Sequence, residues 1–123
     1  MEFLTVSAPN SPPTLTIGAN PSPDESQVQI RVAATALNYA DLLMIEGRYQ
    51  DTPPFPLTPG LEIAGTVTAI GKDVSTLQVG DRIAAITGHG GLAEYATIDA
   101  DRALSLPDTI DFPTAAAFQI TYA

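Results

Sequence analysis

Residues 59–65 are Pro59-Gly60-Leu61-Glu62-Ile63-Ala64-Gly65, and they lead from a proline-rich connection into an apolar segment. The connection, residues 50–59, contains four prolines and is expected to be extended and stiff. From Ile63 to Ile70 the residues are small, apolar or threonine, and Gly71 follows directly. This pattern predicts a strand that ends at the glycine.

Further strand patterns lie on both sides of this segment. Val28–Val32 alternates apolar and polar residues, as a strand with one buried face does. Eleven prolines and nine glycines divide the chain into short segments, which favours short strands over long helices. The other predicted strands are Leu15–Ile17, Arg82–Ile86, Leu92–Ile98 and Ala103–Leu106. The fold class is therefore expected to be mainly β.

Two short helices are predicted from local start signals. Asn38 is a preferred N-cap residue, Asp41 stands in the capping-box position, and Gly47 follows the expected end. Asp111 and Pro113 open a second helix that reaches Ala123 without an end signal. We expect residues 1–123 to form one domain, with residues 111–123 as the start of a helix that continues beyond Ala123.

Charge and composition exclude several classes of function. Fourteen acidic and five basic residues give a net charge of −9, and the scattered bases cannot follow a phosphate backbone, so we expect no nucleic-acid partner. The absence of cysteine excludes disulfides and cysteine-based metal sites. No apolar run approaches the ~20 residues of a membrane span, and the N-terminus lacks a signal-peptide pattern. We expect a cytoplasmic protein without a membrane partner.

Four local patterns follow one another along the chain. They are Asn38-Tyr39-Ala40-Asp41, the 59–65 motif, Val79-Gly80-Asp81-Arg82-Ile83 and Gly90-Gly91-Leu92-Ala93-Glu94-Tyr95. In this order and spacing they resemble the medium-chain dehydrogenase/reductase superfamily, and within it the zinc-independent quinone oxidoreductases, or zeta-crystallin-like group. The resemblance covers nearly all of residues 28–123. Each pattern alone is weak, whereas the ordered set is specific.

The resemblance implies a GroES-like catalytic domain, which is a partly open β-barrel with short helices and so a β-rich α+β fold. Residues 1–27 match only as the variable opening hairpin of the family. In the family a Rossmann domain follows, and its glycine-rich turn holds the NADPH phosphates. Residues 1–123 contain no such turn, because the cluster Gly88–Gly91 precedes a predicted strand rather than a helix. We interpret that cluster as a hairpin turn.

The resemblance also predicts that catalysis does not use zinc. Zinc-dependent relatives have a cysteine at the position of Asn38 and a histidine at that of Leu61, and catalytic zinc needs three protein ligands. The four-cysteine lobe that binds structural zinc in those relatives is missing as well. His89 is the single histidine, and we expect it to be exposed in its glycine-rich turn. No metal site is expected.

Five residues are candidates for the active cleft. In the family, the segment from Asn38 to Leu43 lines the cleft beside the nicotinamide, and the helix that carries Gln119 runs under it. The cofactor-binding candidates are therefore Asn38, Tyr39, Leu43 and Gln119. The catalytic candidates are Asn38, Tyr39 and Tyr49. Asn38 is taken from the family's cleft, and the tyrosines are included because a phenol can donate a hydrogen bond to a carbonyl oxygen that gains charge. Two alternatives stay open, namely that Asn38 is only a helix cap and that both tyrosines only pack.

Two other residues, and the candidate Leu43, occupy positions that matter in the family. Asp41 is interpreted as the capping-box partner and Glu62 as a buried, hydrogen-bonded structural carboxylate. A general-base role is not favoured for either, because no histidine or second acid lies near in sequence. Family members often have a tyrosine at the position of Leu43, and this departure bears on quinone specificity.

The expected function is that of the N-terminal catalytic domain of an NADPH:quinone oxidoreductase. The enzyme would pass a hydride from NADPH to a quinone or an α,β-unsaturated carbonyl, would bind most of the cofactor outside residues 1–123, and would be a homo-oligomer at full length. Residues 1–123 alone are expected to be inactive. The alternatives are a stand-alone GroES-like module for binding or oligomerisation, and an enoyl-reductase domain. The choice between NADPH and NADH, and the identity of the acceptor, stay open.

Overall fold

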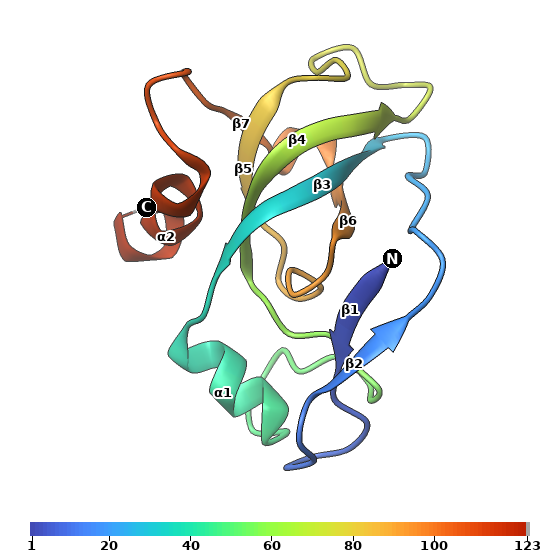
Figure 1. Ribbon diagram of the computed structural model, residues 1–123, viewed down its shortest axis with the longest axis vertical. Helices are drawn as coiled ribbons and strands as arrows, with labels where there is room; N and C mark the ends of the chain where they lie inside the picture. Colours follow the sequence, from blue (N-terminus) through green and yellow to red (C-terminus); the bar gives the residue numbers. More distant parts are fainter. Residues whose placement is uncertain (123) are drawn as a thin grey trace.

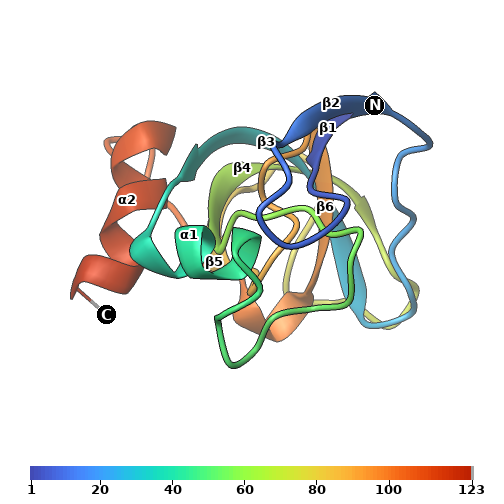
Figure 2. The same cartoon turned by 90° about the horizontal axis from the view of Figure 1, so that it is seen from below.

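The computed structural model describes residues 1–122, with side chains described as far as Ala117 (Figure 1). Its centre is an antiparallel sheet of five strands in the order β6-β3-β4-β5-β7. The strands are β3 (Gln27–Ala36), β4 (Glu62–Ile70), β5 (Arg82–Ile86), β6 (Tyr95–Asp99) and β7 (Leu104–Ser105). The sheet curves into a partly open barrel (Figures 1 and 2), so the expected mainly β, GroES-like fold is confirmed.

A hairpin and three helical segments complete the described residues. The hairpin pairs β1 (Glu2–Thr5) with β2 (Thr14–Ile17) and lies beside β6 (Figure 1). The helical segments are α1 (Tyr39–Ile45), the 3₁₀ turn η1 (Ala100–Arg102) and α2 (Phe112–Tyr122). In the part of the chain that the structure describes, no helix has both the length and the apolar character needed to cross a membrane.

The main core fills the inside of the barrel. On β3 the buried residues Val28 and Ile30 alternate with less buried ones, as the sequence pattern predicts. They pack against buried residues of the neighbouring strands, which are Ile63, Val67, Leu77, Ile83, Ala85, Ala96 and Ile98. Removing this much apolar surface from water is the largest favourable contribution to folding.

Two smaller clusters attach the helices to the barrel. Met44 on α1 packs with Val6, Leu57 and Leu61, which joins the helix to the hairpin and to the proline-rich connection. On the outer face of the sheet, α2 is seated through small residues, namely Ala64 and Ala84 of the sheet and Ala115 and Ala116 of the helix. Small side chains let a helix backbone approach the sheet closely, and α2 lies against β3, β4 and β5.

Two glycines of the 59–65 motif lie where backbone from another part of the chain leaves no room for a side chain. A Cβ on Gly60, whose φ is +112°, would lie 2.6 Å from the backbone nitrogen of Leu92. A Cβ on Gly65 would lie 2.1 Å from the carbonyl oxygen of Arg31 on β3. Both positions require a residue without a side chain because backbone from a distant segment occupies the space.

Three sequence-based strand boundaries were wrong. The strand predicted at Val28–Val32 continues to Ala36 as β3. The strand predicted at Leu92–Ile98 begins at Tyr95, because the preceding residues bond to β1 instead: the Leu92 carbonyl accepts from Leu4 N–H at 2.9 Å. The strand predicted at Ala103–Leu106 is shortened to Leu104–Ser105. The turn η1 precedes it and was not predicted.

Candidate functional site

The candidate site begins where β3 passes into α1. Asn38 is the N-cap of α1 and forms a capping box with Asp41, whose Oδ2 accepts a hydrogen bond from the Asn38 backbone N–H at 2.8 Å. The other carboxylate oxygen of Asp41 accepts from the Gly60 N–H, also at 2.8 Å. Asp41 is 1% exposed. The predicted capping role is therefore confirmed, and the same side chain also fixes the turn of the 59–65 motif.

Glu62 approaches Asn38 from the neighbouring strand. Its side chain is fully buried, and its Oε1 accepts a hydrogen bond from the Asn38 Nδ2 at 3.2 Å. The Thr35 hydroxyl donates to the Glu62 backbone carbonyl at 2.6 Å, which fixes the start of β4 against β3. The interpretation of Glu62 as a buried, hydrogen-bonded carboxylate is confirmed.

An exposed apolar surface surrounds Asn38. Leu37 is 71% exposed, Tyr39 72% and Leu42 57%, and we call these three residues the α1 apolar patch. Asn38 itself is half-buried. A half-buried polar amide thus lies next in sequence to exposed apolar side chains.

The other predicted site residues are distributed differently. Leu43 is half-buried, and its carbonyl oxygen accepts hydrogen bonds from the N–H groups of Arg48 at 2.8 Å and Tyr49 at 3.3 Å. These bonds place Tyr49 just beyond the end of α1, where its side chain packs against the cluster that contains Met44. Gln119 lies outside the residues whose side chains are described.

Sequence reasoning missed one residue that supports the site. The Thr87 hydroxyl donates to the Gly60 carbonyl at 2.8 Å, and the Thr87 N–H donates to the Leu61 carbonyl at 2.6 Å. Thr87 therefore bonds to the carbonyl groups of the 59–65 motif, whereas Asp41 bonds to its Gly60 N–H. The only signal in the sequence was a threonine directly after an apolar strand, which is too common to select it.

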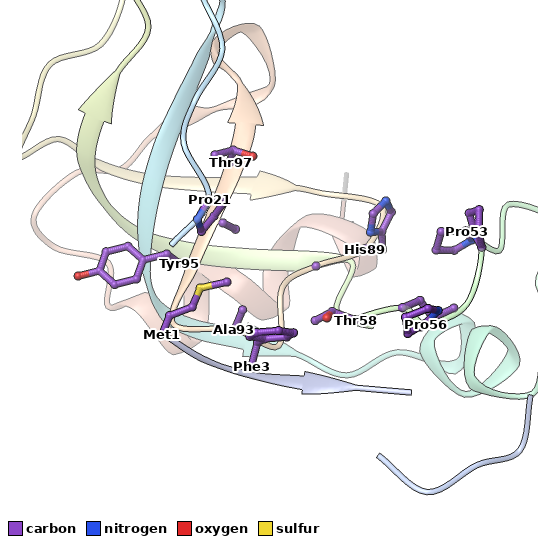
Figure 3. Close-up of a pocket in the computed structure, with 14 residues that line it drawn as sticks. Met1, Phe3, Pro21, Pro53, Pro56, Thr58, His89, Ala93, Tyr95 and Thr97 are labelled. Atoms are coloured by element: carbon purple, nitrogen blue, oxygen red, sulfur yellow. The ribbon is translucent and has the colours of Figure 1, made fainter. Parts of the chain in front are cut away.

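A cavity of about 590 Å³ opens between the hairpin, β6 and the proline-rich connection (Figure 3). Its lining is mostly apolar and includes Phe3, Pro56 and Ala93, with the hydroxyl of Thr58 and the ring of His89 among its few polar groups. None of the lining residues is acidic, lysine or arginine, and none is a predicted site residue. His89 is exposed, as its glycine-rich turn led us to expect.

The acidic residues of the site serve to fix Asn38. Asp41 and Glu62, the two buried carboxylates of the site, both accept hydrogen bonds from this residue. Within residues 1–122, no group of three or more histidine, cysteine, aspartate or glutamate side chains is arranged to hold a metal ion.

A partly open antiparallel barrel, with its first helix capped against a Pro-Gly turn, is the architecture of a GroES-like domain. Comparison with family models agrees, because the alcohol dehydrogenase GroES-like domain matches residues 24–108. The chain belongs to this family, as the four ordered motifs predicted.

Curated relatives share most of this chain. The synaptic vesicle membrane protein VAT-1 homolog of Rattus norvegicus is 39% identical over 102 residues, which are 83% of this chain and 25% of that protein. The quinone oxidoreductase of Sus scrofa is 41% identical over 105 residues, which are 85% of this chain and 32% of that protein. The chain thus spans about a quarter to a third of these relatives.

Solved structures give the same result. The human VAT-1 homolog-like protein superposes with a TM-score of 0.92 at 32% identity, covering 96% of this chain and 39% of that one. The Thermus thermophilus quinone oxidoreductase, whose structure was also solved in complex with NADPH, gives 0.87 at 32% identity, covering 99% and 38%. The CurK enoyl reductase gives 0.84 at 29% identity, covering 94% and 38%.

Proposed function

We propose that the chain is the catalytic-domain part of an NADPH-dependent oxidoreductase that reduces a quinone or an α,β-unsaturated carbonyl without zinc. The observation that supports this most directly is the Asn38 amide, held by a buried carboxylate at 3.2 Å and surrounded by the α1 apolar patch. The names of similar proteins, which include quinone oxidoreductases, support the same class of reaction.

The residues around Asn38 fit a nicotinamide ring. Tyr39 and Leu42 offer exposed apolar surface to the faces of a flat ring, and Asn38 offers a polar group to its substituent. With Leu43 and Gln119, Asn38 and Tyr39 make up the proposed contacts of this chain with the cofactor. NADPH supplies the hydride when it is bound, and its phosphates would be held by a part of the protein beyond these residues.

The residues of this chain would orient the acceptor and stabilise its charge. A carbonyl oxygen becomes more negative as its conjugated system accepts a hydride, so a neutral donor beside it lowers the barrier. The phenol of Tyr39, 72% exposed, is free to turn toward such an oxygen. Tyr49 packs against an apolar cluster, which supports a structural role for its ring. Asn38 and Leu61 provide neither thiolate nor imidazole at the two family positions that bind zinc.

Steady-state kinetics of the full-length protein tests this proposal. We expect NADPH oxidation with 1,4-benzoquinone or but-3-en-2-one that does not change after treatment with a zinc chelator. The variant Tyr39→Phe is expected to lower kcat/KM by about 100-fold or more, as loss of one transition-state donor does. The matched control Tyr95→Phe should leave it unchanged. No oxidation with either acceptor would refute the function, and full activity in Tyr39→Phe would refute the role of Tyr39.

Reduction of an enoyl thioester is the second candidate. The superposition on CurK enoyl reductase favours it, and the chemistry is again hydride transfer to the β-carbon of a conjugated carbonyl. The same assay with the crotonyl thioester of N-acetylcysteamine separates the two candidates. A kcat/KM for the thioester well above that for 1,4-benzoquinone would make enoyl reduction the main activity.

A further inference from the structure

We propose that Glu62 is a positioning residue, which holds the amide of Asn38 so that its carbonyl Oδ1 meets a ligand group that donates a hydrogen bond. The proposal rests on the proposed function, because it concerns the same cleft. It adds a residue that touches neither cofactor nor acceptor, and it defines the chemistry that Asn38 can recognise.

The position of Glu62 is fixed by strand pairing. Glu62 is the first residue of β4, and its backbone is opposite Ala36, the last residue of β3. The Thr35 hydroxyl bonds to the Glu62 carbonyl at 2.6 Å, so the start of β4 cannot slide along β3. The side chain is fully buried and is directed to Asn38, two residues beyond the end of β3.

A buried carboxylate determines which end of the amide faces it. A carboxyl oxygen that accepts a hydrogen bond needs a donor opposite it, and the amide of Asn38 has donors only on its nitrogen. The Asn38 nitrogen therefore points to Glu62, at 3.2 Å from Oε1. Turning the amide over would place its oxygen against the carboxylate oxygen. That arrangement loses the bond and adds repulsion in a buried place.

Counting donors and acceptors shows what remains for a ligand. The amide nitrogen of Asn38 carries two hydrogens, and it contacts the Glu62 Oε1 at 3.2 Å and the Ala36 carbonyl at 3.5 Å. Both acceptors belong to the protein. The oxygen Oδ1 has two lone pairs, and the capping box uses at most one of them. The group of Asn38 that is left for a ligand is thus an acceptor.

The backbone of Asn38 is held as well. Its N–H donates to Asp41 Oδ2 at 2.8 Å, so two buried carboxylates fix one residue, one through the backbone and one through the side chain. The capping box accounts for the first of these contacts and also engages the Asn38 side-chain oxygen. The contact with Glu62 fixes the amide nitrogen.

The complementary ligand group is a hydrogen-bond donor. A primary carboxamide N–H on the cofactor and a hydroxyl on the acceptor both qualify, whereas the carbonyl oxygen of a quinone does not. Within the proposed site, Tyr39 would then serve as donor to a carbonyl oxygen and Asn38 as acceptor. The two neighbouring residues would recognise opposite kinds of group.

A double-mutant cycle in the full-length protein tests the proposal. Glu62→Leu removes the acceptor, Glu62→Gln keeps an acceptor oxygen, and each is made alone and together with Asn38→Ala. We expect Glu62→Leu to lower kcat/KM by about 10-fold, the equivalent of one hydrogen bond, and Glu62→Gln to recover most of the loss. In the Asn38→Ala background the further loss from Glu62→Leu should be under about twofold, because positioning acts only through Asn38.

Two controls separate positioning from stability and identify the donor. Thr68→Val removes a hydroxyl that bonds to Gln29 at 2.8 Å on the same sheet, and it should lower Tm without the kinetic loss. The cycle is repeated with the reduced 3-acetylpyridine analogue of NADPH, whose acetyl group replaces the carboxamide and has no N–H. If Glu62→Leu lowers kcat/KM with NADPH but not with the analogue, the donor belongs to the cofactor. If it lowers kcat/KM equally with NADPH and the analogue, the donor belongs to the acceptor.

An independent readout does not require activity. The side-chain NH₂ of Asn38, observed by NMR in the same protein, should exchange its hydrogens slowly, and Glu62→Leu should make this exchange fast. Fast exchange in the parent protein would overturn the proposal even where NADPH oxidation is found. Equal kinetic losses from Glu62→Leu with and without Asn38→Ala would overturn it too. If the exchange is slow but the protein oxidises no NADPH, the proposed function is refuted, whereas the positioning of the Asn38 amide by Glu62 is supported.

Discussion

Asp41 connects two motifs that lie 19 residues apart in the chain. Each of its carboxylate oxygens accepts one backbone N–H at 2.8 Å, from Asn38 before α1 and from Gly60 before β4. Ionised carboxylates are rarely buried unless they are hydrogen-bonded in this way. A single side chain therefore sets the position of α1 relative to the sheet, and with it the position of Asn38.

Substitution of Asp41 should destabilise the fold accordingly. We expect Asp41→Ala to lower the free energy of unfolding by about 3 kcal/mol, because two bonds to a charged group are lost and a buried N–H is left without an acceptor. Asp41→Asn keeps one acceptor oxygen and should cost about half as much. Urea unfolding followed by circular dichroism measures both values. The exposed Asp51→Asn is the control, and a loss from Asp41→Ala no larger than in this control would contradict the account.

At the scale of elements, local signals predicted the helices better than the strand ends. Both helix starts carry their own capping residues, and the structure places α1 and α2 where those residues indicated. The strand β6 was predicted to begin at Leu92, but it begins at Tyr95. The residues before Tyr95 pair with β1 instead, which is more than 80 residues distant in the chain. A partner so far away leaves no periodic signal in the sequence.

In the candidate site too, the local contact could be predicted from the sequence and the long-range contact could not. The capping pair Asn38 and Asp41 was visible as a local pattern, three residues apart. The contact between Asn38 and Glu62 spans 24 residues and depends on the pairing of Ala36 with Glu62. Register between strands is set by packing of the whole sheet, so the sequence predicted a buried carboxylate and not what it binds.

The start of α2 should respond to acid through Asp111. Hydrogen bonds from the Thr114 side chain and backbone N–H hold the pKa of this carboxyl below its ordinary value of 3.8, and Arg82 contributes in the same direction. A lowered pKa means that the ionised form stabilises the folded state. This stabilisation is complete above pH 3.8 and is lost as the pH falls through the lower folded-state value.

Hydrogen exchange of the first turn of α2, measured by NMR over this range, tests the expectation. Protection of the Ala115 amide, which donates to the Asp111 carbonyl at 3.1 Å, should decrease below pH 3.8 in the parent chain. In Asp111→Ala it should be low and nearly independent of pH, while the exposed Asp108→Ala should behave like the parent. Identical pH profiles for Asp111→Ala and the parent would rule out this cap as the cause.

At the scale of the whole molecule, charge and exposed apolar surface oppose each other. The net charge of −9 makes copies of the chain repel. The α1 apolar patch, with its three residues between 57% and 72% exposed, favours contact with another surface.

The isolated 123-residue chain should therefore associate with itself in a salt-dependent way. At about 0.01 M salt repulsion acts over roughly 30 Å, whereas at 1 M it is screened within about 3 Å. Sedimentation velocity should accordingly show a monomer at low salt and association at high salt. Replacing Leu37 and Leu42 with glutamine should abolish this association. The matched control replaces Val79 and Leu104 with glutamine. These residues are 63% and 59% exposed and lie away from α1, so this variant should still associate at high salt. Equal loss in both double variants would show that association needs only general apolar exposure, and a monomer at high salt would show that the patch does not drive association.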